Sequence, residues 1–135
     1  MILASLALFL AQDAASAPVP QRTVAQDRLA VCLDHARTDP ATAIGEASNW
    51  AVGVTGPESS YPQQCLGLAY TMLLRWDAAE QAFLLARDAA GENAHFRRAQ
   101  LATMAGNAAL AQGRPADALV SVSYTHLTLP TKRIV

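Results

Sequence analysis

Alanine constrains the fold of this chain more than any other residue, because it supplies the largest share of the apolar positions. The sequence has 29 alanines among 135 residues, and only 6% of its residues are aromatic. Alanine is the strongest helix former, and its short side chain allows helices to approach each other closely. Since 52% of the residues are hydrophobic, a chain of this length has enough apolar residues for the core of one domain. The composition therefore predicts a single all-α domain.

Capping and turn residues divide residues 18–120 into six helix-length segments. Asp39 can accept a hydrogen bond from a free backbone N–H at a helix start, and Pro40 suits the first helical position, where no N–H is needed. The expected helices begin near the following residues: Thr23, Asp39, Pro62, Asp77, Ala94 and Arg114.

Local signals also predict how individual helices begin and end. Asp77 and Glu80 are three residues apart, which is the spacing of a capping box at the start of the fourth helix. Gly91 and Gly113 are expected to end the fourth and fifth helices, because glycine tolerates the left-handed backbone conformation. The connections are short, so consecutive helices are expected to be antiparallel and to form hairpins.

Two of the expected hairpins are related by an internal repeat. Aligning Gly67 with Gly106 superposes further pairs that are each 39 positions apart: Leu66 and Ala105, Tyr70 and Ala109, Trp76 and Pro115, Ala79 and Ala118, and Phe83 and Val122. The predicted fold is therefore all-α, with antiparallel helical hairpins stacked on one another.

Residues 60–91 resemble a tetratricopeptide repeat. The residues at the spacing of that family are Leu66, Gly67, Tyr70, Trp76, Ala79, Phe83 and Ala86. A second unit is indicated by Gly106, Gly113 and Ala118, and residues 21–51 form a degenerate first unit. The resemblance covers about two thirds of the chain and implies a short α-solenoid of about three helix pairs. It also implies that Gly67 is small where two helices cross closely.

The resemblance implies a binding surface as well, because the first helices of such hairpins line a concave face that binds peptides or proteins. The side chains expected on this face are Tyr61, Gln64, Leu68, Thr71, Met72, Gln100, Thr103, Asn107, Leu110 and Ala111. Family members that clamp a terminal carboxylate use Lys, Arg and Asn here, and only Asn107 is present. A mixed apolar and amide surface suits a hydrophobic or extended segment of a partner. The alternative is that Leu68, Met72 and Leu110 simply pack against neighbouring helices.

Cys32 and Cys65 lie on the first helices of adjacent hairpins, and such helices are side by side in this architecture. A disulfide is therefore expected in an oxidising compartment. The alternative is a pair of buried thiols that act as small apolar groups.

Residues 1–17 resemble a secretory signal. Ile2 to Ala11 form an apolar run that is too short to span a bilayer, and Ala15-Ser16-Ala17 supplies small residues for cleavage. An exported, periplasmic protein is expected, and an uncleaved anchor or a buried first helix in a cytoplasmic protein are the alternatives.

Residues 121–135 differ in composition from the rest of the chain. They contain no alanine but do contain the only lysine, Lys132. Residues 123–135 resemble a translated sequencing-adapter tail on a truncated gene prediction, and a native tail is the alternative. On the first reading, the native helical stack continues beyond about residue 120. Truncation predicts exposed apolar surface, and self-association through it, around Leu101, Met104, Ala105 and Leu119.

Several classes of function lack support in the residues. The formal net charge of −1 provides no basic surface for nucleic acid. No phosphate-binding loop, nucleophile elbow or isolated pair of carboxylates indicates an enzyme, and no cofactor site is recognisable. Cys32, His35 and His95 are too few for a structural zinc site. A protein-binding scaffold is the expected function. The alternatives are a structural component of an envelope assembly and the N-terminal part of a longer enzyme.

Overall fold

The computed structural model describes residues 17–128, except for the side chains of Val122 and residues 124–128. Its α-helices are α1 (Val24–Thr38), α2 (Pro40–Val52), α3 (Ser60–Met72), α4 (Trp76–Ala89), α5 (His95–Ala111) and α6 (Pro115–Thr128). A short 3-10 helix, η1 (Gly56–Ser59), precedes α3. The described residues contain no β-strand, so the predicted all-α class is confirmed.

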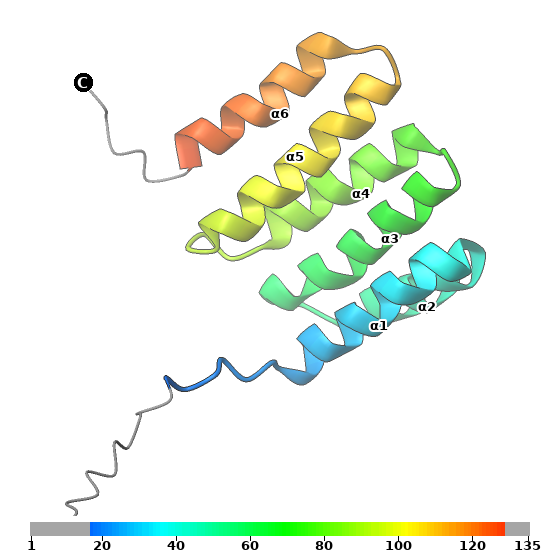
Figure 1. The fold of residues 1–135 in the computed structure, drawn as a ribbon, viewed down its shortest axis with the longest axis vertical. Coiled ribbons are helices and arrows are strands. Elements are labelled where there is room, and N and C mark those ends of the chain that lie inside the picture. Colours follow the sequence, from blue (N-terminus) through cyan, green and yellow to red (C-terminus); the bar gives the residue numbers. More distant parts are fainter. Residues whose placement is uncertain (1–16, 129–135) are drawn as a thin grey trace, which may run out of the picture.

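The six helices form three antiparallel hairpins, α1–α2, α3–α4 and α5–α6, which are stacked side by side (Figure 1). Each helix packs against the next one in the sequence, and α1 also packs against α3. The predicted stack of hairpins is therefore confirmed. In this arrangement α1, α3 and α5 are the first helices of their hairpins. Within residues 17–128, no helix is long and apolar enough to cross a membrane.

The 39-residue repeat extends to the backbone of the turns after α3 and α5. Leu74 (φ 59°) and Gly113 (φ 74°) are 39 positions apart, and both have the left-handed conformation. The next residue in each turn, Arg75 or Arg114, donates its N–H to the carbonyl five residues earlier, at 2.9 and 3.0 Å respectively. This is the hydrogen-bond pattern of a Schellman motif, in which glycine is the usual left-handed residue.

Replacing Leu74 with glycine is expected to raise the free energy of unfolding by about 0.5–1 kcal/mol. The left-handed conformation costs a non-glycine residue roughly 1–2 kcal/mol, and the greater freedom of glycine in the unfolded chain offsets part of this gain. The Leu74 side chain is 69% exposed, so little packing is lost. Urea denaturation of Leu74→Gly measures the effect. The reverse change at the equivalent turn, Gly113→Leu, should be destabilising, and equal stabilities of all three proteins would contradict the argument.

Two predicted helix ends are wrong. Asp77 and Glu80 form no capping box, because the N-cap of α4 is Arg75, two residues before Asp77, and Arg75 makes no side-chain cap hydrogen bond. The carboxylate of Glu80 instead accepts hydrogen bonds from the α5–α6 turn. Gly91 does not end α4 in a left-handed conformation, since the helix ends at Ala89 and the next residue is already extended.

The boundary predicted at residue 120 does not end a helix, because α6 continues to Thr128. No proline interrupts the chain between Pro115 and Pro130, and the Ser121 hydroxyl donates to the carbonyl of Asp117 at 3.2 Å. The foreign origin of residues 121–135 stays a prediction. The signal-like residues 1–17 lie outside the described residues apart from the last of them.

The core is built around the hairpin crossings. Gly67 lies against the ring of Phe83, and a Cβ atom on this glycine would be 2.5 Å from the nearest ring carbon. This confirms the prediction that residue 67 is small where α3 crosses α4. Tyr70 and Trp76 are half-buried, whereas the other repeat-defining residues are buried: Leu66, Gly67, Ala79, Phe83, Ala86, Gly106 and Ala118.

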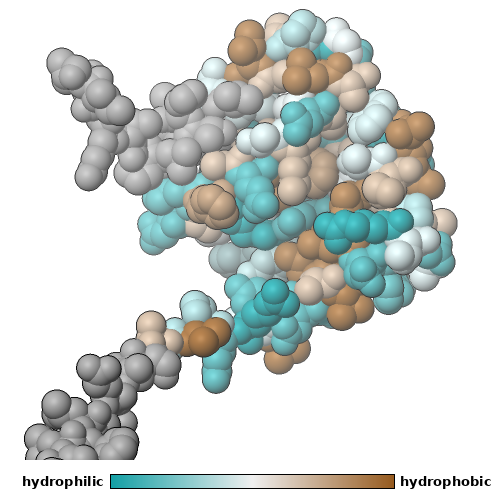
Figure 2. All heavy atoms as spheres, viewed as in Figure 1, coloured by the Kyte–Doolittle hydropathy of each residue, from teal (hydrophilic) through white to brown (hydrophobic). Residues whose placement is uncertain are grey.

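The predicted exposure of the last hairpin is largely wrong. Leu101 and Ala105 are fully buried and Met104 is half-buried, because α5 packs against both α4 and α6. Leu119 is 67% exposed, as expected. Exposed apolar side chains also occur at the α3–α4 turn, and brown spheres appear at the right-hand edge of the molecule where this turn lies (Figure 2).

Cys32 of α1 and Cys65 of α3 lie at disulfide distance, with their Cα atoms 6.0 Å apart. Both residues are buried, at 4% and 0% exposure. The prediction that these two first helices lie side by side is thus confirmed, and a bridge between the two cysteines would join the first hairpin to the second.

Candidate binding groove

A groove of about 450 Å³ runs across the first helices of the three hairpins. Helices α1, α3 and α5 supply most of its lining, and α4 supplies two aromatic residues. We call it the α1–α3–α5 groove, and its lining residues are Leu33, Arg37, Gln64, Leu68, Thr71, Trp76, Phe83, Gln100, Met104, Asn107, Ala108 and Ala111. An apolar cleft with a few polar side chains is the usual form of a ligand site.

Gln64 is the exceptional polar residue of this groove. It is only 7% exposed, and its Oε1 atom is buried with no hydrogen-bond partner among the described residues. A buried amide without a partner costs free energy, so such groups are rare in folded proteins. Two further amides, those of Gln100 and Asn107, line the same groove and are exposed. The groove therefore presents hydrogen-bonding capacity that the chain itself does not use at Gln64.

The residues predicted for the concave face separate into two sets. Those that line the groove are Gln64, Leu68, Thr71, Gln100, Asn107 and Ala111, whereas Tyr61, Met72, Thr103 and Leu110 lie outside it. Leu68 lines the groove and also packs against the core, so its position is compatible with both alternatives considered for it. Met72 and Leu110 are 47% and 54% exposed and do not pack as buried residues.

Several lining residues were missed by the sequence prediction. Leu33 and Arg37 belong to α1, whose repeat signature is too degenerate to align with the other hairpins. The cysteine pair could have placed Leu33 and Arg37 beside α3 from the sequence, because a bridge between Cys32 and Cys65 would set the register of α1 against α3. Trp76, Phe83, Met104 and Ala108 are core-facing positions whose edges reach the groove.

Tyr61 lies outside the groove because it belongs to a ladder of stacked side chains. The Tyr61 ring stacks on the Trp50 ring, with centroids 6.4 Å apart. The guanidinium carbon of Arg97, a residue of α5, lies 4.5 Å from the centroid of the Tyr61 ring. Arg28 of α1 lies 4.5 Å from the Trp50 ring. The two cation–π contacts and the aromatic stack between them join α1, α2, α3 and α5.

The start of α3 is held by a buried hydroxyl. Ser60 is fully buried, and its Oγ donates to the carbonyl of Ala86 at 2.6 Å. The same oxygen accepts hydrogen bonds from Nε and Nη2 of Arg97 at 3.2 and 2.9 Å. Burial lowers the pKa of the Arg97 guanidinium from its ordinary value. This network positions α3, and with it Gln64, against α4 and α5.

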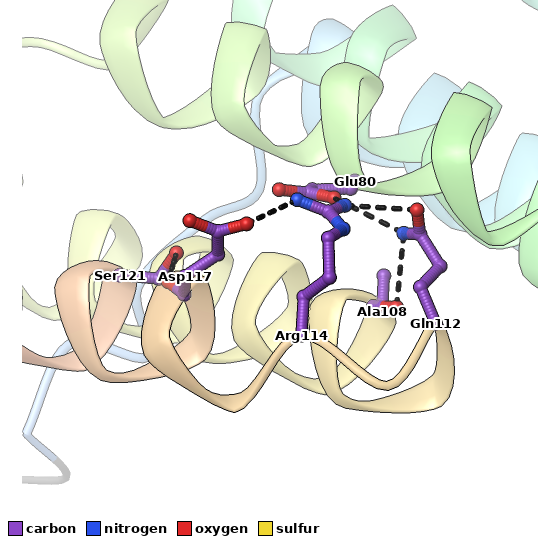
Figure 3. Close-up of polar contacts among 6 residues, drawn as sticks. All are labelled: Glu80, Ala108, Gln112, Arg114, Asp117 and Ser121. Carbon is purple, nitrogen blue, oxygen red and sulfur yellow. Dashed lines mark hydrogen bonds and ion pairs between the residues drawn. The ribbon is translucent and has the colours of Figure 1, made fainter.

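The opposite end of α5 is held by a second polar network (Figure 3). The guanidinium of Arg114 contacts Glu80 of α4, and it donates to Asp117 at 2.6 Å and to Gln112 at 2.8 Å. Hydrogen bonds to Asp117 and Glu80 raise the pKa of Arg114. Gln112 also donates to Glu80 and to the carbonyl of Ala108, each at 3.1 Å. The α5 wall of the groove is therefore tied to α4.

Stability is expected to decrease as the pH rises from 6 to 9, because His35 of α1 pairs with Glu46 of α2 at 2.8 Å. The hydrogen bond to Glu46, followed by its charge, raises the pKa of His35 above the ordinary 6.5. The protonated imidazole therefore stabilises the fold fully below pH 6.5, and this contribution is lost as pH rises through the higher pKa of the folded state.

Thermal unfolding of the native chain and of His35→Gln across this range checks the effect. The stability of His35→Gln should fall much less with rising pH than that of the native chain. If both proteins lost stability equally over this range, another group would be responsible for the pH dependence. Asp39, whose pKa is lowered by hydrogen bonds from Thr42, titrates below this range.

Among residues 17–128, no group of three or more His, Cys, Asp or Glu side chains could hold a metal ion. Comparison with protein-family models, with curated proteins and with solved structures found no match to this chain.

Proposed function

We propose that this chain is a protein-interaction scaffold that binds an extended segment of a partner protein in the α1–α3–α5 groove. The observation that carries the proposal is Gln64, a buried amide with an unpaired Oε1 in an otherwise largely apolar groove. The N–H of a peptide group in a ligand would satisfy this oxygen once the Gln64 side chain turns toward the groove that it lines. Binding would then remove the cost that the free protein bears.

The resemblance to tetratricopeptide repeats supports the same proposal, because the inner helices of that family form its binding face. Here the first helices of all three hairpins contribute to the groove. Residues 1–17 and the cysteine pair further support export to an oxidising compartment such as the periplasm. A cytoplasmic location remains the alternative and predicts reduced thiols.

Panning a phage-displayed library of random ten-residue peptides on the immobilised full chain tests the proposal. Selected peptides should bind Leu68→Glu and Asn107→Ala at least about tenfold more weakly, since each change removes part of the groove. Leu110→Glu is the matched control, because Leu110 is exposed and lies outside the groove. Circular dichroism of each variant separates lost binding from lost folding.

Gln64→Leu gives a sharper version of this test. Removing the buried, unpaired Oε1 of Gln64 should leave stability unchanged or increase it, whereas peptide binding should weaken. If Gln64→Leu and Asn107→Ala bind every selected peptide as the native chain does, the groove is not the binding site. A structural role in an envelope assembly, without a ligand groove, would then be the better account.

A further inference from the structure

Of the described residues, Arg37 is the only charged one that lines the α1–α3–α5 groove. Its side chain is exposed, and its Nη1 makes a long hydrogen bond of 3.4 Å to the carbonyl of Leu33. Among the residues that the structure describes, no carboxylate lies within ion-pair distance of Arg37. The groove therefore carries a positive charge that no described carboxylate pairs with directly, although the formal net charge of the whole sequence is −1.

The polar groups of the groove lie toward opposite ends of the first helices, α1, α3 and α5. Arg37 is in the last turn of α1 and Thr71 is near the end of α3, whereas Gln64 is in the first half of α3. These first helices run in the same direction in the stack (Figure 1). The apolar side chains of Leu33, Leu68 and Met104 line the same groove, together with the ring of Phe83.

We propose that the groove selects an extended, apolar peptide segment that carries an Asp or Glu side chain. The segment's carboxylate pairs with Arg37, its apolar side chains contact Leu68 and Met104, and a main-chain N–H is donated to Gln64. Charge complementarity supports this occupant, because the lining residues within 17–128 include one cation and no anion. A basic segment would place like charges together and would leave Arg37 unpaired. This specificity rests on the proposed peptide-binding function.

The test pans the same phage library on the native chain, on Arg37→Glu and on Arg22→Glu. The displayed peptides are fused at their C-terminus, so a terminal carboxylate cannot substitute for a side chain. Arg22 is exposed and lies outside the groove, so its variant matches the change in net charge. Peptides selected on the native chain and on Arg22→Glu should be enriched in Asp and Glu, whereas Arg37→Glu should lose this enrichment.

A second measurement uses one selected peptide, synthesised with an amidated C-terminus. Changing its acidic residue to the corresponding amide should weaken binding to the native chain by about fivefold, the scale of a partly exposed ion pair. The same peptide change should have no effect on Arg37→Gln, because the partner charge is already absent.

The outcomes separate the specificity from the underlying function. Peptides that depend on Leu68 and Asn107 but show no acidic enrichment would overturn the role of Arg37 and leave the binding function intact. The same applies if Arg37→Glu selects the same peptides as the native chain. If no selected peptide depends on the groove, both proposals fail.

Discussion

Replacing Cys32 and Cys65 together by alanine is expected to lower the free energy of unfolding by about 3–4 kcal/mol. In the chain-entropy model, this is the effect of releasing a bridge between residues 33 positions apart. The loss is large for this chain because the core around the bridge depends heavily on alanine, which offers little apolar area per residue. Alanine keeps a small apolar side chain at each buried position, and the reduced native chain separates loss of the bond from loss of the sulfur atoms.

Urea denaturation measures this effect on the oxidised chain, on the same chain in a dithiol reductant, and on the double variant. Reduction should destabilise the native chain and leave the double variant unchanged. Equal midpoints for oxidised and reduced native protein would show that the cysteines do not form a bridge in solution.

The bridge also matters for the proposed groove, because it holds α1 beside α3. Leu33 and Arg37 lie on α1, whereas Gln64 and Leu68 lie on α3. Reduction is therefore expected to weaken peptide binding as well as stability, even at temperatures where the chain remains helical.

Replacing Gly67 with alanine is expected to lower the free energy of unfolding by about 2–3 kcal/mol. The new Cβ would lie 2.5 Å from the Phe83 ring, and this ring is only 4% exposed and cannot move aside freely. Overpacking of this kind typically costs 1–3 kcal/mol, and the higher helix propensity of alanine recovers only part of it. The proximity of α3 and α4 is thus the reason for the glycine.

Gly45→Ala is the matched control, because Gly45 is exposed in α2 and a Cβ there would meet nothing within 4 Å. This change should raise stability by roughly 0.5–1 kcal/mol through helix propensity alone. Phe83→Leu should partly rescue Gly67→Ala by opening space beside residue 67. If both glycine variants were stabilised equally, the close approach of Phe83 would be refuted.

The helices were predictable because their signals are local. Asp39 caps α2 as expected, accepting a hydrogen bond from the Thr42 N–H at 3.3 Å, and Gly113 has the left-handed conformation after α5. Periodicity and caps depend on residues within about four positions of each other, so a single sequence reveals them. The capping box formed by Thr23 and Gln26 was not predicted, although these residues have the three-residue spacing that is typical of the motif.

The polar contacts were less predictable because their partners are distant in the chain. Glu80 has the spacing of a helix cap, yet its carboxylate pairs with Arg114, 34 positions away. A stronger charged partner, available only after the hairpins stack, replaces the local backbone donor. The same reason explains Ser60, whose contacts with Ala86 and Arg97 join residues 26 and 37 positions apart.

Local patterns along the chain were enough to predict the all-α class, the order of the helices, the hairpin repeat and the close helix crossing at Gly67. Which side chains line the groove could not be predicted in this way, because it depends on the register of α1 against α3 and α5. In the folded chain Arg37 lines the groove, whereas Tyr61 lies outside it and stacks with Trp50 and Arg97. Gln64 is buried, and its Oε1 has no partner among the described residues. Local propensity specifies where helices form, whereas packing between distant helices specifies which polar groups find partners and which remain available to a ligand.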